Sequence, residues 1–303
     1  MKIAIGPSSF ASVDKTPLEV LQSKGLKVIN NPYSRKLTEN EIIVHLQGVD
    51  GLIAGLEPLT SNVFQQSIDL KVIARVGIGM ENVDMESAEM HKIKVSNTPD
   101  GPTDAVSEMT LAAALSLSRN IVQANGALHE KQWEKSIGMG LKNANVLIVG
   151  YGRIGRKVAD LFRIMGAHIL ICDPLVAKKD LQYGEILLEL KDGLKLADII
   201  TLHAGGDDQI LTETEFKTMK KGAIVLNSAR ANLIDENALI YALDSGKVSS
   251  AWLDVFWQEP YTGKLTGYNQ VLLTPHMSTY SVQCRKDMEL AAVNNLLRDL
   301  GIE

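Results

Sequence analysis

The chain has 303 residues, a net charge of −5 at pH 7, and 45% hydrophobic but only 5% aromatic residues. A single hydrophobic core seldom grows over a chain of this length, so we expect two domains. The negative charge argues against nucleic acid or an anionic membrane as the partner and favours a small molecule.

The N-terminus begins directly with a strand-like segment and has no signal peptide, and no apolar run approaches the ~20 residues of a membrane helix. We therefore expect a cytoplasmic protein. The two cysteines, Cys172 and Cys284, lie far apart in unlike contexts. They predict neither a disulfide framework nor a metal cluster, and no metal site is expected.

Residues 1–95 alternate strand-like and helix-like segments and contain no glycine fingerprint, which predicts a small open parallel sheet. Ligands bind at the carboxyl ends of parallel strands. The loops at this rim contain Ser8, Ser9, Gly55, Leu56 and the segment Val76–Met80. From Thr103 to Trp133 the pattern is continuously helical, with Asn125-Gly126 as the candidate interruption.

Residues 145–174 read as strand, glycine turn, helix, strand and acid, which indicates a nucleotide-binding βαβ unit. Gly150 allows a tight turn, Gly152 close approach to a pyrophosphate, and Gly155 close packing of helix on strand. A bare glycine triplet is often an ordinary turn, but the apolar strand before it and the helical spacing after it favour the nucleotide site. Asp173 follows Gly155 by 18 residues, a position from which a carboxylate can accept hydrogen bonds from the ribose hydroxyls. NAD is favoured over NADP, because the 2′-phosphate of NADP would meet this negative charge.

The second half continues the alternation, with strands predicted at 146–149, 168–172, 198–202, 223–227, 250–253 and 271–274. The last helical stretch, Val282–Leu300, has no strand after it, and we expect it to return to the first domain. The expected fold is α/β, with two Rossmann-like or flavodoxin-like parallel-sheet domains and a cleft between them. We assign residues 1–97 and 278–303 to a discontinuous substrate-binding domain and residues 98–277 to an NAD-binding domain.

Three segments with unusual residue types follow strands in the second half, namely 227–230, 253–260 and 274–276. Together with the glycine turn, the loop 75–84 and the segment 97–108, they resemble the D-2-hydroxyacid dehydrogenase family, which includes the D-3-phosphoglycerate dehydrogenases. The resemblance covers essentially the whole chain. It implies an NAD-dependent oxidoreductase that interconverts a D-2-hydroxy acid and its 2-oxo acid.

The resemblance implies that Arg230 holds the substrate carboxylate and that His276 and Glu259 form the acid/base pair. A guanidinium fork binds a carboxylate in a bidentate manner, and imidazole suits proton transfer near neutrality. Taken singly, each of the three could be an ordinary loop or surface residue. Because all three follow strands of one predicted sheet, at its ligand-binding edge, we favour the catalytic interpretation.

The resemblance also implies roles for residues around the reacting atoms. Asp254 would accept a hydrogen bond from the nicotinamide carboxamide, although it could instead cap its strand, and His203 would lie near the cofactor without donating a proton. The loop Val76–Gly79 would offer N–H groups to the substrate, and Arg75 would serve a second anionic group. The expected cofactor residues are Gly150, Gly152, Arg153, Ile154, Gly155, Asp173, His203, Ala229, Asp254 and Thr103. The expected substrate residues are Arg75, Val76, Gly77, Ile78, Arg230 and His276.

The chain departs from the family pattern at several positions. Gly55-Leu56 stands where many phosphoglycerate enzymes have Arg-Ser, Ala231 replaces a glycine, Pro102 replaces an asparagine, and the loop after His203 is short. 3-Phosphoglycerate is therefore an open possibility as substrate. Because the chain ends at Glu303, we expect it to lack the C-terminal regulatory domain that some of those enzymes carry. The alternative function is a non-catalytic NAD(H)-sensing or partner-binding protein on the same scaffold. By analogy we expect a homodimer that uses the helix Thr103–Leu117 and its neighbours.

Overall fold

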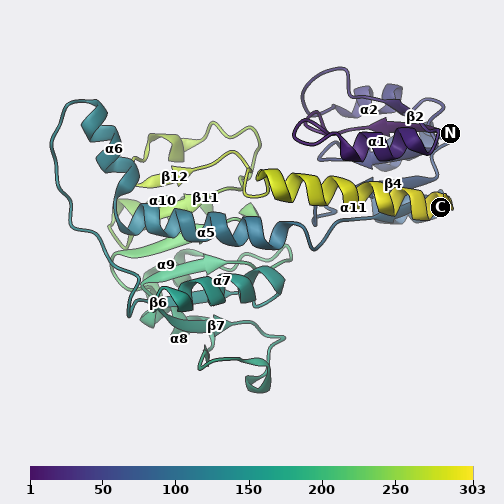
Figure 1. The fold of residues 1–303 in the computed structure, drawn as a ribbon. Helices are drawn as coiled ribbons and strands as arrows, with labels where there is room; N and C mark the ends of the chain where they lie inside the picture. Colours follow the sequence, from purple (N-terminus) through teal and green to yellow (C-terminus); the bar gives the residue numbers. More distant parts are fainter. Residues whose placement is uncertain (303) are drawn as a thin grey trace. The chain divides into compact units, whose positions relative to one another are not determined.

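The computed structural model describes residues 1–302, which form two compact units. Unit 1 contains Met1–Pro102 and the segment from Tyr280 onward, and unit 2 contains Thr103–Thr279. Both units are parallel sheets covered by helices (Figure 1). This confirms the predicted fold class of two α/β parallel-sheet domains.

The sheet of unit 1 has five parallel strands in the order β2-β1-β3-β4-β5. The order reverses between β1 and β3, as in flavodoxin-like folds, and such a reversal leaves a crevice at the carboxyl ends of the two strands. The strands are β1 (Lys2–Ile5), β2 (Lys27–Ile29), β3 (Gly51–Ala54), β4 (Val72–Arg75) and β5 (Lys94–Ser96). The helices are α1 (Thr16–Ser23), α2 (Glu39–His45), α3 (Ser61–Gln66), α4 (Met85–Met90) and α11 (Val282–Leu300).

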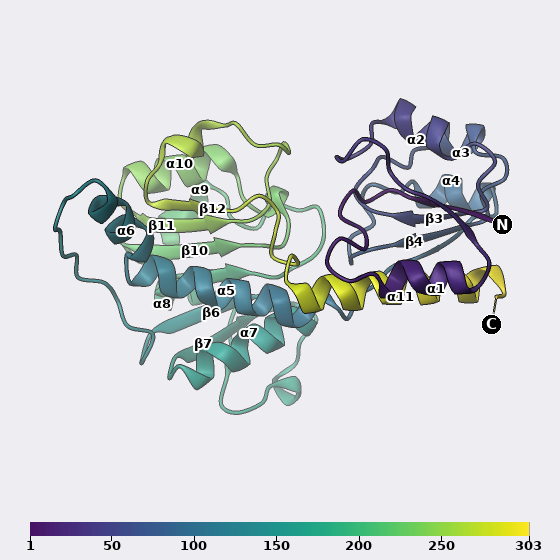
Figure 2. The same cartoon turned by 45° about the horizontal axis from the view of Figure 1, so that its top comes forward.

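The core of unit 1 forms because β3 and β4 are apolar and buried on both faces, as expected of central parallel strands. One face is covered by α2 and α3, whose side chains join a buried cluster around Leu52 and Phe64. The long C-terminal helix α11 packs on β3, β4 and β5 and also contacts α1 (Figure 2). The final segment of the chain therefore belongs to the same unit as the first strands.

The sheet of unit 2 has seven parallel strands in the order β12-β11-β10-β9-β6-β7-β8. Its order reverses between β6 and β9, which is the arrangement that binds dinucleotides in Rossmann folds. The strands are β6 (Asn145–Val149), β7 (His168–Cys172), β8 (Ile186–Leu187), β9 (Ile199–Leu202), β10 (Ala223–Asn227), β11 (Val248–Leu253) and β12 (Val271–Leu273). The α-helices are α5 (Pro102–Ser118), α6 (Ile121–His129), α7 (Arg153–Ile164), α8 (Leu190–Leu196), α9 (Glu213–Thr218) and α10 (Glu236–Asp244).

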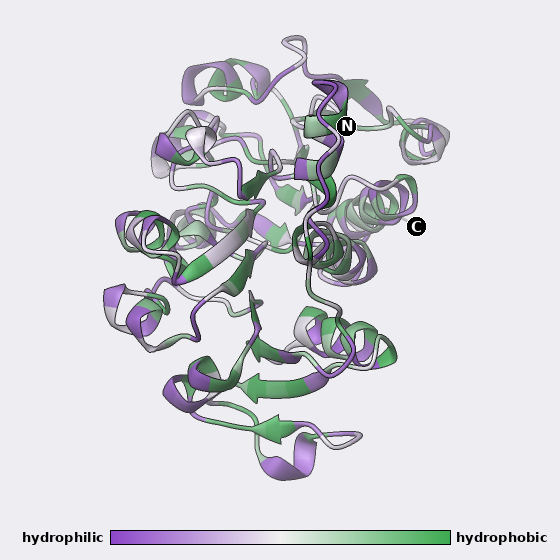
Figure 3. Ribbon diagram, turned by 90° about the vertical axis from the view of Figure 1, so that its left-hand side faces the viewer, coloured by the Kyte–Doolittle hydropathy of each residue, from purple (hydrophilic) through white to green (hydrophobic). Residues whose placement is uncertain are grey.

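Two apolar clusters fill the two sides of this sheet, one against α5 and α7 and the other against α8, α9 and α10. Figure 3 shows the contrast between the hydrophobic strands and the helices, which combine hydrophobic and hydrophilic residues. Asp235 is the N-cap of α10, because its Oδ1 accepts a hydrogen bond from Ala238 N at 2.9 Å. Among residues 1–302, none of the helices combines the length and apolar character that a membrane span requires.

The sequence predicted a helix from Thr103 to Trp133 with an interruption at Asn125-Gly126. The predicted position of the interruption and the predicted C-terminal end are both wrong. α5 ends at Ser118, and Asn120 adopts the left-handed conformation with φ 54° before α6 begins. Asparagine tolerates this conformation better than most residues, which explains the break. Gly126 lies inside α6, which ends at His129.

Candidate active site

Three neighbouring strands of unit 2 end level with one another. Asn227 at the end of β10 pairs with Leu253 of β11, which pairs with Leu273 of β12. The segments that follow these strands carry Arg230, Glu259 and His276. The predicted catalytic residues therefore leave the same edge of the sheet, from adjacent strands, as the sequence pattern required.

The structure pairs two of these residues directly. His276 Nδ1 lies 3.0 Å from each carboxylate oxygen of Glu259. Both side chains are partly exposed, His276 by 45% and Glu259 by 35%, so a substrate can reach them. Because Nδ1 is engaged by the carboxylate, proton exchange with a substrate would use Nε2.

The backbone of His276 has φ 51°, which is uncommon for a residue other than glycine. The adjoining residues are held by Asp254, which is only 1% exposed. Its Oδ1 accepts hydrogen bonds from Thr274 Oγ1 at 2.6 Å and Met277 N at 2.9 Å, and its Oδ2 accepts one from Ser278 N at 2.8 Å. Asp254 thus fixes the loop on both sides of His276, a role that the sequence analysis missed.

The loop that carries Arg230 is fixed in a similar way by Asn227, which is 1% exposed. Its Oδ1 accepts from Ala229 N at 3.0 Å, and its Nδ2 donates to Arg230 O at 2.8 Å. Arg230 Nη1 also donates to Ala229 O at 2.8 Å. Within the same loop the buried hydroxyl of Ser228 has no hydrogen-bond partner among the described residues. A buried polar atom of this kind is the feature expected where a ligand completes the site.

The glycine turn after β6 has the geometry that a pyrophosphate site needs. Gly150 has φ 93°, and a Cβ there would lie 2.4 Å from Ala204 N. A Cβ on Gly155 would lie 2.0 Å from Gly150 O, whereas a Cβ on Gly152 would meet nothing within 4 Å. α7 starts after Gly152 without a side-chain cap, so its first-turn N–H groups and dipole suit an anion. The residues present fit NAD.

Asp173 follows β7, beside this turn. Its Oδ2 accepts a hydrogen bond from Tyr151 N at 2.7 Å, and its Oδ1 accepts one from Leu175 N at 2.9 Å. An ionised carboxylate has about four acceptor sites. These two bonds orient the carboxylate and leave acceptor capacity for the two hydroxyls of a ribose.

His203 follows β9, across the crevice from Gly150. Its Nε2 lies 2.9 Å from Thr201 Oγ1, and burial lowers the pKa of the ring to about 3. A ring that is neutral near pH 7 is a poor proton donor. The remaining predicted cofactor residues lie at this end of unit 2: Arg153 and Ile154 in the first turn of α7, Thr103 in the first turn of α5, and Ala229 after β10.

In unit 1 the predicted substrate loop follows β4. Val76 N already donates to Ala54 O at 2.8 Å, and Gly77 N donates to Thr98 Oγ1 at 2.7 Å. The N–H groups of Ile78 and Gly79 make no hydrogen bond within residues 1–302. Of the four N–H groups predicted to bind substrate, those of Val76 and Gly77 already have partners within unit 1. Arg75 is 9% exposed, and its Nη1 donates to Val76 O at 3.2 Å.

Sequence reasoning did not single out Glu57, which lies two residues after Gly55 and is 1% exposed. Its Oε1 accepts a hydrogen bond from Gly55 N at 2.9 Å. Burial raises the pKa of this carboxyl, while its hydrogen bonds to backbone N–H groups and the positive charges of Arg75 and Lys36 oppose that effect. The available signal was an acidic residue three positions after the end of the buried strand β3.

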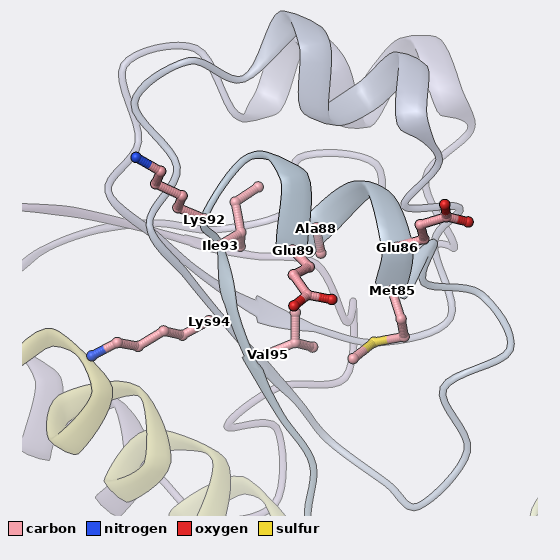
Figure 4. A pocket seen from close by; sticks show the side chains of 8 residues that line it. All are labelled: Met85, Glu86, Ala88, Glu89, Lys92, Ile93, Lys94 and Val95. Carbon is pink, nitrogen blue, oxygen red and sulfur yellow. The ribbon is translucent and has the colours of Figure 1, made fainter.

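An open pocket of about 470 Å³ lies in unit 1 between α4 and the segment that leads into β5 (Figure 4). Its lining includes Met85, Glu89, Lys92 and Val95. None of the predicted site residues lines it. Among residues 1–302, no group of three or more His, Cys, Asp or Glu side chains is arranged to hold a metal ion.

Comparison with known proteins adds independent findings. Residues 111–278 match the family model described as D-isomer specific 2-hydroxyacid dehydrogenase, NAD binding domain. The chain is 36% identical to D-3-phosphoglycerate dehydrogenase of Sus scrofa over an alignment of 290 residues. This alignment covers 92% of this chain and 54% of that protein. The chain thus spans about half the length of the D-3-phosphoglycerate dehydrogenase.

A second relative matches over nearly its full length. Hydroxypyruvate reductase of Thermotoga maritima is 31% identical over 300 residues, which is 96% of each chain. Among solved structures, the TT0316 protein from Thermus thermophilus superimposes with a TM-score of 0.91 at 30% identity, over 100% of this chain and 98% of that one.

Proposed function

Because the chain belongs to the D-isomer specific 2-hydroxyacid dehydrogenase family, we propose that it is an oxidoreductase that interconverts a D-2-hydroxy acid and its 2-oxo acid. Unit 2 contains the NAD-binding domain of this family, and NAD is its cofactor. The observation that carries the proposal is the pair of His276 and Glu259, 3.0 Å apart, on the sheet edge that also carries Arg230.

In the proposed reaction the bound nicotinamide supplies the hydride that reduces the 2-oxo carbon. Arg230 binds the substrate carboxylate by charge-assisted hydrogen bonds and orients the carbonyl. His276 delivers a proton from Nε2 to the carbonyl oxygen as it becomes a hydroxyl, and takes it back in the reverse direction. Glu259 accepts the hydrogen bond from Nδ1 and stabilises the protonated ring.

Of the residues expected to bind substrate, Arg230 and His276 belong to unit 2, while Arg75, Ile78 and Gly79 belong to unit 1. The activities after which the two relatives are named, D-3-phosphoglycerate dehydrogenase and hydroxypyruvate reductase, support 2-oxo acids of three carbons as first candidates.

The test is a steady-state assay of NADH oxidation with glyoxylate, pyruvate, hydroxypyruvate and 3-phosphohydroxypyruvate. We expect activity with at least one of them. The second candidate is a non-catalytic NAD(H)-sensing protein, and the intact set of Arg230, Glu259 and His276 argues against it. NADH binding by calorimetry together with no oxidation of NADH by any 2-oxo acid would favour that candidate instead.

We also propose a homodimer, and we place its contact surface on α6, a neighbour of the predicted helix Thr103–Leu117. The predicted helix directs Ala113, Ala114 and Leu117 into the core of its own unit. Exposed apolar side chains lie instead on α6 and the segment after it, which project from unit 2 in Figures 1 and 2. Trp133 is 79% exposed and Ile137 is 100% exposed. The other exposed apolar residues of this region are Ile121, Val122 and Leu128.

Such a concentration of exposed apolar groups is typical of an interface. Light scattering coupled to size exclusion should give a dimer for the wild type and more monomer for the double variant Trp133→Ser and Ile137→Ser. The control is Ile68→Ser, at a residue that is 88% exposed in unit 1. A monomeric wild type at micromolar concentration would contradict the proposal.

The predicted cytoplasmic location stays a prediction.

A further inference from the structure

The crevice of the unit 1 sheet is closed by a side chain of the protein itself. The strand order reverses between β1 and β3, and this is the place where open α/β sheets bind ligands. Gly6 follows β1 and Gly55 follows β3, so these two glycines flank the crevice. Both are buried, and Glu57 lies against both of them.

The fit of Glu57 between the two glycines is close. A Cβ on Gly6 would lie 1.9 Å from Glu57 Oε1, and a Cβ on Gly55 would lie 3.1 Å from Glu57 Oε2. The carboxyl therefore occupies the space that side chains at these positions would fill. Gly55 N donates to Glu57 Oε1 at 2.9 Å, so the group is also held by a hydrogen bond.

The loops around this carboxyl are fixed by two asparagines. Asn82 Nδ2 donates to Glu57 O at 2.7 Å and to Gly55 O at 3.2 Å. Asn31 Nδ2 donates to Gly6 O at 2.6 Å. These bonds join the loops after β1 and β3 to neighbouring segments. Glu57 is consequently a built part of the rim and not a mobile surface acid.

A phosphate would find the wrong chemistry here. It carries nearly two negative charges at pH 7 and needs several N–H donors or cations around its oxygens. A carboxyl offers at most one donor when protonated and none when ionised. Glu57 also lies near enough to Arg75 to interact with its charge, so the cation at the end of β4 acts beside an acid.

We infer that Glu57 is a specificity-determining residue, because its carboxyl makes the rim of unit 1 unsuited to a phosphate of the substrate. The preferred 2-oxo acid then carries a short uncharged side chain, such as that of hydroxypyruvate or glyoxylate. This inference rests on the proposed function and adds the substrate class to it.

The experiment compares hydroxypyruvate with 3-phosphohydroxypyruvate, which differ only by the phosphate. The quantity measured is the ratio of their kcat/KM values with NADH, in the wild type, Glu57→Gln and Glu57→Ala. The matched control is Glu289→Gln, because Glu289 is likewise a buried acid of unit 1 that lies beside an arginine. Glu289 is 2% exposed, and its Oε1 lies 2.7 Å from Arg285 Nη2. Its Oε2 accepts a hydrogen bond from Ala11 N at 2.8 Å.

We expect the wild type to favour hydroxypyruvate by about 100-fold or more, because a phosphate would meet unsuitable groups. Glu57→Gln removes the acid at constant volume, and Glu57→Ala also opens the crevice, so each should lower the ratio about tenfold or more. The ratio in Glu289→Gln should stay within about threefold of the wild-type value. Circular dichroism checks that each variant is folded.

Equal use of both substrates by the wild type would overturn the inference, and this result needs no variant. An unchanged ratio in folded Glu57→Gln and Glu57→Ala would overturn it as well. If NADH is not oxidised with any 2-oxo acid although it binds, the proposed function itself has failed. That outcome is distinct from active enzyme with the opposite substrate preference.

Discussion

Glu259 holds His276 by its Nδ1, which lies 3.0 Å from both carboxylate oxygens, although the two residues are 17 positions apart and follow different strands. A carboxylate in this position sets the tautomer of the ring and supports its protonated form. The pair therefore has the polarity needed to give a proton to a carbonyl oxygen and to take it back.

Removal of the imidazole should abolish most of the reaction while leaving cofactor binding intact. We expect His276→Ala to lower kcat by about 100- to 10,000-fold, the usual contribution of general acid/base catalysis. The dissociation constant of NADH, measured by fluorescence titration, should change less than threefold, or about 0.6 kcal/mol. The control is His168→Ala, at an exposed residue that begins β7. Unchanged turnover of His276→Ala would contradict the assignment.

Loss of the Asp254 carboxylate should disturb the loop around His276. Asp254→Asn places an amide where three donors converge, so at least one buried donor loses its acceptor. The free energy of unfolding in urea should fall by about 1–3 kcal/mol, and kcat should fall with it. Asp244→Asn is the control, since Asp244 accepts an exposed hydrogen bond from Tyr268. A wild-type stability for Asp254→Asn would show that these bonds are dispensable.

The two glycines at the start of α7 should respond differently to an added methyl group. A Cβ at Gly155 would lie 2.0 Å from Gly150 O, so Gly155→Ala should destabilise unit 2 by about 2 kcal/mol or more. Gly152 faces open space, so Gly152→Ala should change stability by less than about 1 kcal/mol.

Gly152→Ala should nevertheless weaken NADH binding by about tenfold or more, because its Cβ would meet the pyrophosphate. Thermal denaturation and NADH titration of both variants check the two expectations. Tight NADH binding by folded Gly152→Ala would place the pyrophosphate elsewhere.

The half-buried ring of His203 should make the protein sensitive to acid. Its pKa is lowered to about 3 in the folded state, against about 6.5 in an unfolded chain. Between these values the unfolded chain binds a proton that the folded state does not, so stability falls as the pH decreases through this window. At pH 5 the loss relative to pH 7 is at most about 2 kcal/mol.

His203→Gln should therefore lose less stability between pH 7 and pH 5 than the wild type does. Urea unfolding at the two pH values measures the difference. His168→Gln serves as the matched control and should keep the acid sensitivity of the wild type. Equal acid sensitivity in His203→Gln and the wild type would show that the ring of His203 is not the source.

Much of the candidate site could be read from local sequence. The glycine turn, the acid of Asp173 and the segments with Arg230, Glu259 and His276 each follow an apolar strand, and parallel strands bring such positions to one edge. The break at Asn120 could not be read in this way, because the apolar pattern continues across it. A single left-handed residue changes the direction of the chain without changing hydrophobic periodicity.

The sequence by itself determined the two parallel-sheet domains and the glycine turn, because hydrophobic periodicity and turn chemistry act over a few neighbouring residues. The proposed acid/base residues, Glu259 and His276, came from the resemblance of their segments to a known family. Only the tertiary structure decided which groups the side chains of Asp254 and Glu57 contact. Asp254 binds donors 20 to 24 residues away, and Glu57 lies against Gly6 across the reversal of strand order. Contacts at such separations depend on which strands become neighbours, and that is settled by packing of the whole sheet.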